Sequence, residues 1–281
     1  MKTVYLDTIS INKLYDQLNR KFKYSRLQKY NFAISSCQTD ELGCIESPMR
    51  RSQLTEFIFK ISDKRELKDH IEIMSSETLF EIGARDTIEY IDPDYLNYDG
   101  MVKGIIKNRL PDDFYKDAIN SMGNAKKTYK DGRKEMRSLQ PIFNSLEEIG
   151  LKKSFEEIFI EMIEEGLINN FLFETLQYES EYLGFNFDNY KEDILNMDLS
   201  KLKCSYVGLQ GKFAYDYLSS FEKGKISKLK ASDQVDVRHL YYLNYADVFV
   251  TDDEKIQTIY NMIFGITSKI ESTDSFINNY L

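Results

Sequence analysis

The chain has 281 residues and a formal net charge of −9, and 42% of its residues are hydrophobic and 30% charged. This composition is ordinary for a globular protein of one large domain or two modest ones. No apolar run approaches the ~18 residues of a membrane span, and Asp7 comes too early for a signal peptide, so we expect a cytoplasmic protein without a membrane partner.

The first 91 residues read as strands that alternate with helices, a pattern that predicts a mostly parallel sheet. Ile71–Met74 alternates like a short strand, although it could equally begin a helix. Pro48 stands where a helix is expected to begin, since proline is favoured in a first turn. The expected elements, in chain order, are a strand at Thr3–Leu6, a helix over 9–18, a strand at Phe32–Ile34 and a helix at Pro48–Ile61.

From residue 92 onward the pattern becomes helical. Turn signals at Asp92-Pro93 and Asp99-Gly100 come first, and apolar residues then recur at a spacing near 3.6, as in Phe155–Met162. We interpret 92–225 as a large all-helical insertion, which the basic stretch Lys223–Lys230 joins back to an α/β core made of 1–91 and 226–281. A strand is expected at Val248–Val250.

Acidic residues stand where the predicted strands end or a later helix begins. Asp7 follows the first strand, Asp40 and Glu41 follow the second, Asp236 lies in a helix that Ser232 or Asp233 caps, and Thr251-Asp252-Asp253 follows Val248–Val250. Parallel strands bring their carboxyl ends to one edge of the sheet, so these side chains are expected to converge. The alternative for each acid is a helix cap or a solvated helix face.

These segments resemble the PIN domain, a family of metal-dependent ribonucleases. The resemblance covers Val4–Thr8, Ile34–Leu42, Asp236–His239 and Val250–Asp253, within about 1–90 and 225–270, and the long middle has no counterpart. It implies a PIN-like parallel sheet flanked by helices and a catalytic set of acids that binds Mg²⁺ or Mn²⁺. That set is Asp7, Glu41, Asp236 and Asp253, with Asp252 as the alternative to Asp253 and Asp40 as the alternative to Glu41.

Carboxylate oxygens are the ligands that Mg²⁺ and Mn²⁺ prefer, and such a cation activates water for attack on a phosphodiester. His239 lies on the same side of the helix as Asp236, so it is expected to hydrogen-bond Asp236 or to touch substrate. A basic helix face is the candidate surface for the phosphate backbone. The expected substrate-binding residues are Thr8, Ser36, His239, Thr251, Lys126, Lys130, Arg133 and Arg137.

Other motifs are missing from the sequence. The three cysteines include no C-x-x-C pair, and Cys37 and Cys44 with His70 match no common zinc spacing. No phosphate-binding glycine loop and no G-x-S-x-G motif occurs.

We therefore predict an endoribonuclease, with a toxin, defence or RNA-processing role implied by the resemblance. RNA is the expected partner, with a protein partner or inhibitor at the insertion, or a homodimer, as further options. The alternatives are an inactive PIN-like scaffold that binds a protein or RNA, and a flap-type DNA nuclease.

Overall fold

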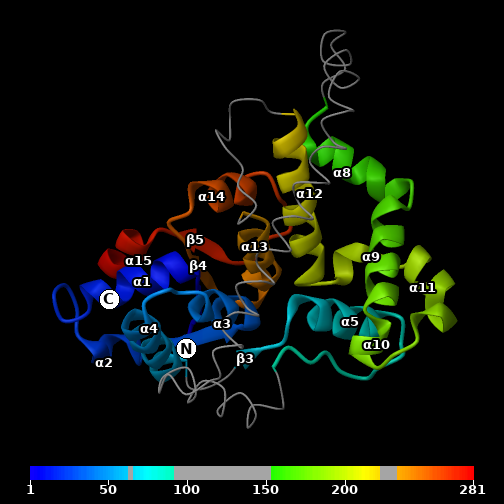
Figure 1. The fold of residues 1–281 in the computed structure, drawn as a ribbon. Coiled ribbons are helices and arrows are strands. Elements are labelled where there is room, and N and C mark those ends of the chain that lie inside the picture. The colour runs from blue at the N-terminus through cyan, green and yellow to red at the C-terminus, as the bar shows by residue number, and fades with distance from the viewer. Residues whose placement is uncertain (63–65, 92–152, 222–232) are drawn as a thin grey trace.

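The computed structural model describes residues 1–62, 66–91, 153–221 and 233–281 (Figure 1). Its centre is a sheet of five parallel strands in the order β3-β2-β1-β4-β5. The predicted parallel sheet flanked by helices is therefore confirmed. The strands are β1 (Thr3–Leu6), β2 (Asn31–Ser35), β3 (Glu66–Leu67), β4 (Val248–Val250) and β5 (Lys269–Glu271).

Alternation along β1 directs its side chains to two separate cores. Val4 is in register with Phe32 and Val248, and all three belong to one buried apolar cluster. Tyr5 is in register with Ala33 and Phe249, and these belong to the other. This is the period of two that a strand imposes. Most helical residues of the first cluster come from α1 (Thr8–Gln17), α4 (Pro48–Ile61) and α15 (Thr273–Tyr280), and Leu27 and Leu42 join it from two shorter helices.

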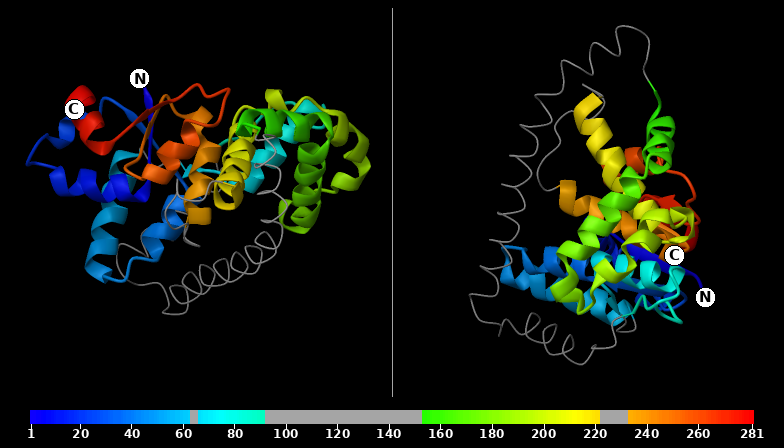
Figure 2. Two further views of the ribbon diagram at one scale, coloured as in Figure 1. Left: turned by 90° about the horizontal axis from the view of Figure 1, so that it is seen from above. Right: turned by 90° about the vertical axis from the view of Figure 1, so that its right-hand side faces the viewer.

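The second face of the sheet carries a thicker helical layer (Figures 1 and 2). Against it lie α5 (His70–Glu81), α12 (Ser205–Phe221), the 3-10 helix η3 (His239–Tyr245) and α14 (Glu254–Tyr260). Farther out are α8 (Phe155–Glu164), α9 (Leu167–Tyr178), α10 (Ser180–Leu183) and α11 (Lys191–Asn196). The remaining short elements are α2 (Tyr24–Leu27), α3 (Ser36–Gly43), η1 (Phe187–Tyr190), η2 (Leu199–Lys201) and α13 (Asp233–Arg238).

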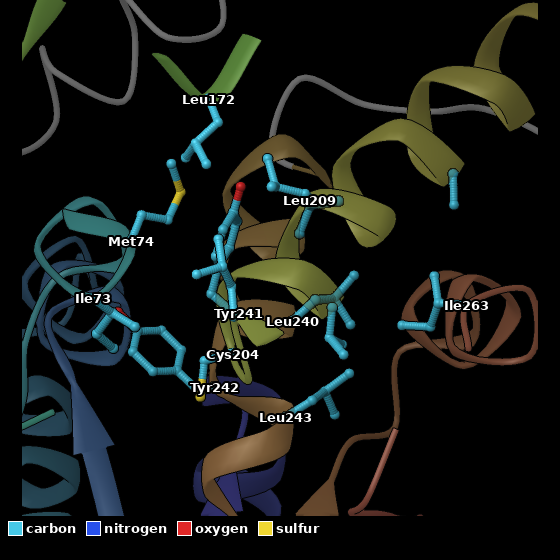
Figure 3. Close-up of a cluster of buried hydrophobic side chains, with 14 of the residues drawn as sticks. Ile73, Met74, Leu172, Cys204, Leu209, Leu240, Tyr241, Tyr242, Leu243 and Ile263 are labelled. Atoms are coloured by element: carbon cyan, nitrogen blue, oxygen red, sulfur yellow. The ribbon is translucent and has the colours of Figure 1, made fainter. Parts of the chain in front are cut away.

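The described part of the predicted insertion, 153–221, is helical, and it shares its core with the sheet. Figure 3 shows side chains of α5, α9, α12 and η3 meeting in one cluster, including Met74, Leu172, Leu209 and Leu240. Gly208 in α12 permits the close approach of η3, because a Cβ there would overlap the Tyr241 ring. The predicted boundaries at residues 92 and 225 lie outside the described residues.

Local sequence explains several helix starts. Ser47 accepts the Arg50 N–H with Pro48 in the first turn, as expected for α4. Asp69 and Glu72 form a capping box at α5. Ile71–Met74 is therefore helical, which is the second of the two options that its sequence left open. No helix in the described ranges has the length and apolar character needed to cross a membrane.

Candidate metal site at the carboxyl edge of the sheet

Asp7 stands at the carboxyl end of the central strand β1, as the sequence predicted. One carboxylate oxygen, Oδ1, accepts the Ser10 N–H at 2.6 Å and so caps α1. The other, Oδ2, accepts the Thr251 hydroxyl from the end of β4. The residue is only 5% exposed. Burial raises the pKa of Asp7, although the hydrogen bonds from Ser10 and Thr251 lower it in part. Asp7 is therefore both a helix cap and a buried acid at the edge.

Glu41 reaches the same edge from α3. Its Oε2 accepts the hydroxyl of Thr8, the residue after Asp7, and its Oε1 lies 3.3 Å from His239 Nε2. Burial opposes ionisation of Glu41, but the His239 ring and the Thr8 hydroxyl outweigh it and lower its pKa. The alternative acid, Asp40, is exposed. The structure thus brings Glu41 beside the Asp7-Thr8 pair.

His239 is buried between the acids, with 2% exposure. Its Nδ1 is 2.7 Å from the Tyr5 hydroxyl and its Nε2 faces Glu41. Burial lowers the pKa of His239, but the charge and hydrogen bond of Glu41 and the charges of Asp7 and Asp236 raise it overall. Its hydrogen bonds go to Glu41 and Tyr5, whereas the sequence suggested Asp236 or substrate. Asp236 acts on the ring through its charge, from α13.

Thr251 connects the end of β4 to Asp7. Its buried hydroxyl donates to Asp7, and its oxygen accepts the Asp253 N–H at 3.0 Å. The Asp253 carboxylate caps α14 by accepting the Lys255 N–H at 2.7 Å and the Ile256 N–H at 3.1 Å. Asp253 is therefore tied through its backbone to the hydroxyl that binds Asp7.

Asp252 is directed to other partners. Its Oδ1 accepts the Thr273 N–H of α15 at 3.0 Å, and its Oδ2 lies 3.3 Å from Lys13 Nζ of α1. Asp252 is thus bound to α15 and to Lys13, whereas the backbone of Asp253 contacts the hydroxyl that binds Asp7, so we favour Asp253 over Asp252 as the fourth acid of the edge.

Asp69, at the end of β3, extends the row of acids and was missed in the sequence. It accepts the Ser36 hydroxyl at 3.2 Å and lies 3.1 Å from His70 Nδ1. Burial would raise its pKa, but His70 and the Ile71 N–H lower it to about 2. The capping box of Asp69 with Glu72 could have revealed a helix start here. The strand before it has only two residues and therefore no recognisable alternation, so nothing in the sequence placed Asp69 at the end of a strand.

Three hydroxyls predicted to bind substrate instead hold carboxylates. Thr8 donates to Glu41, Ser36 to Asp69 and Thr251 to Asp7. These bonds orient the acids along the edge. The predicted basic face of Lys126, Lys130, Arg133 and Arg137 lies outside the described residues.

The donor chemistry of the edge suits a hard cation, because carboxylate oxygens dominate it. Within the described ranges, however, no three side chains of His, Cys, Asp or Glu are arranged so that they could hold a metal ion. Cys37, Cys44 and Cys204 are free thiols, and burial raises the pKa of Cys37 and Cys204, which disfavours the thiolate that zinc requires.

Comparisons of the chain with protein-family models, with curated proteins and with solved structures found no match.

Proposed function

We propose that this protein is a PIN-like, metal-dependent endoribonuclease whose acidic edge binds Mg²⁺ or Mn²⁺. The observation that carries the proposal is the linkage of Asp7, Glu41 and Asp253. These residues come from three distant parts of the sequence, and hydrogen bonds through Thr8 and Thr251 connect them at one edge of a parallel sheet. Such an edge is where α/β proteins place their ligands.

A cation would relieve the charge that the fold gathers here. Burial already makes ionisation of Asp7 unfavourable, and a bound cation would offset that cost. Asp7 and Glu41 would hold it, with Thr8 and Thr251 orienting their carboxylates. Asp236 and Asp253 would have to move closer to complete the ligand set, because no three such side chains are grouped as a metal site in the described ranges. When bound, the cation would polarise the phosphodiester and acidify the attacking water.

Charge is distributed unevenly over the chain, which bears on where RNA would approach. Residues 153–203 contain twelve acidic and four basic side chains, whereas residues 1–62 contain ten basic and six acidic ones. An acidic surface repels a phosphate backbone. We therefore place the RNA path over the sheet and α1–α4, away from α8–α11.

The alternative of an inactive scaffold has its own support. Tyr178 and Tyr182, at the junction of α9 and α10, are 85% and 63% exposed on this acidic helical surface. Tyrosine is enriched at protein interfaces. A protein partner at these helices is compatible with a nuclease as well as with a scaffold, so activity must decide between them.

Asp7→Asn tests the proposal, with Asp247→Asn as the matched control. Asn keeps an acceptor for the α1 cap but loses the charge. Asp247 accepts the Thr3 N–H at 2.7 Å at the opposite edge of the sheet. With Mn²⁺ and single-stranded RNA, Asp7→Asn should lose at least about 100-fold in kcat/KM, since a cation ligand supplies several kcal/mol. Asp247→Asn should cleave like the wild type.

Three results would overturn the proposal or redirect it. Full cleavage by a folded Asp7→Asn protein ends the assigned role of the edge. Cleavage of DNA flaps but not of RNA selects the flap-type nuclease. A wild-type protein that cleaves neither nucleic acid, with Mg²⁺ or Mn²⁺, selects the scaffold.

A further inference from the structure

A buried chain of hydrogen bonds lies behind the Glu41 carboxylate. Glu41 Oε1 is 3.3 Å from His239 Nε2, and His239 Nδ1 is 2.7 Å from the Tyr5 hydroxyl. The same hydroxyl is 2.7 Å from Ser35 Oγ. Tyr5, Ser35 and His239 are all buried. Both ring nitrogens of His239 therefore have partners within the protein, and neither is left for a metal ion or a phosphate.

Tyr5 holds the buried end of this series of hydrogen bonds in place. Its ring stacks with those of Tyr242, at 5.2 Å between centroids, and Phe249, at 5.6 Å, and is nearly parallel to both. It projects from the central strand of the sheet, and Ser35 ends the neighbouring strand. The hydroxyl that His239 meets is thus held by stacking of the Tyr5 ring on two aromatic neighbours and by a hydrogen bond to Ser35.

Glu41 is held at both of its carboxylate oxygens. Thr8 donates to Oε2 and His239 faces Oε1. A glutamate has three rotatable side-chain bonds, so a carboxylate in a fixed orientation requires such partners. Thr8 comes from α1 and His239 from η3, so the orientation of Glu41 depends on how these two elements sit on the sheet.

We infer that His239 is a positioning residue that orients the Glu41 carboxylate, and that Tyr5 and Ser35 fix its ring. The inference deepens the proposed function and rests on it for the consequence in catalysis. The hydrogen-bond chain itself can be measured without activity. Loss of a partner that orients a metal ligand typically lowers metal affinity or activity by about 10–100-fold.

Two substitutions of His239 separate orientation from packing. The amide of Gln reaches about as far as Nε2 and can still donate to Glu41, whereas the shorter amide of Asn reaches about as far as Nδ1 and can meet only Tyr5. His239→Asn should lower kcat by about 10–100-fold with KM unchanged, and His239→Gln should retain most of kcat. A residue that only fills space would give equal losses in both variants.

Nitrogen-15 NMR of the His239 imidazole ring tests the same hydrogen bonds without substrate or metal. The protein has two histidines, so a His70→Gln variant assigns the signals of His239. Glu41→Gln should shift Nε2 chiefly, and Tyr5→Phe should shift Nδ1 chiefly. Thermal unfolding of each variant checks that the fold is retained.

The outcomes separate this inference from the proposed function. If the His239 nitrogen signals shift selectively in a protein that cleaves no nucleic acid, the positioning geometry is supported and only the nuclease proposal is refuted. Cleavage by the wild type together with equal kcat values for His239→Asn and His239→Gln overturns the positioning role alone. Unchanged nitrogen signals in both Glu41→Gln and Tyr5→Phe also overturn it.

Discussion

Glu77 ties α5 to the N-terminus of α12, and Glu77→Gln should weaken that contact strongly. The buried carboxylate accepts four hydrogen bonds. Oε1 takes the Cys204 N–H at 2.9 Å and the Tyr90 hydroxyl at 2.8 Å, and Oε2 takes the Ser205 N–H at 2.8 Å and the Ser205 hydroxyl at 2.6 Å. The hydroxyls can turn and accept from an amide, but the backbone N–H groups cannot.

In either orientation, the Gln amide nitrogen would therefore leave one backbone N–H without its acceptor. An unsatisfied buried donor costs about 1–3 kcal/mol. Loss of the negative charge at the start of α12 adds up to about 2 kcal/mol. We expect the free energy of unfolding to fall by about 3 kcal/mol.

Urea unfolding followed by circular dichroism measures this change. Glu81→Gln is the control, because Glu81 lies one turn further along α5 and pairs with Lys201, whose side chain is 58% exposed. A surface pair of this kind contributes about 0–1 kcal/mol. Amide hydrogen exchange at Cys204 and Ser205 should accelerate only in Glu77→Gln. Equal destabilisation by the two variants would refute the reasoning.

Three further predictions concern packing, pH and metal. Gly208→Ala should destabilise the protein by about 2 kcal/mol in urea unfolding, because its methyl group would overlap the Tyr241 ring; Gly43→Ala, where a Cβ meets nothing within 4 Å, should be nearly neutral. The pKa of Glu41 is lower in the folded protein than its ordinary value of 4.5, so Glu41 stabilises the fold above pH 4.5 and loses this effect as the pH falls through the lowered pKa. The pKa of His239 is higher in the folded protein than its ordinary value of 6.5, so His239 stabilises the fold below pH 6.5 and loses this effect as the pH rises through the raised pKa. Stabilisation by this pair should therefore be largest between pH 4.5 and 6.5 in melting scans, and a scan of His239→Gln without an altered alkaline arm would contradict it. Mn²⁺ at 100 times its Kd should stabilise the protein by about 2.7 kcal/mol, and a Tm that does not respond to millimolar Mn²⁺ would favour the scaffold.

The sequence alone determined the elements with strong local signals. Thr3–Leu6 and Val248–Val250 are apolar-rich runs followed by Asp7 and by Thr251-Asp252, and both are strands in the structure. Pro48 marked the first turn of α4. By contrast, β3 has only two residues and β5 has the sequence Lys-Ile-Glu, so neither shows the apolar run of β4, and each is defined by its pairing with β2 or β4.

Part of the candidate site could also be predicted. Asp7 and Glu41 were placed by their positions after β1 and β2, since the carboxyl ends of parallel strands share an edge. The helix cap that the sequence offered as the alternative role of Asp7 is present in the structure. The hydroxyl partners of the two acids were not predicted, since Thr251, for example, meets Asp7 across 244 positions of the sequence.

Only the tertiary structure decided which acid each neighbour serves. His239 faces Glu41 and Tyr5 because η3 packs over β1, although Asp236 is nearer in the sequence. Asp252 is distinguished from Asp253 by its ion pair with Lys13 of α1, a residue remote in sequence. Hydrogen bonds depend on distances of a few tenths of an ångström, and the packing of the two cores around the sheet sets those distances.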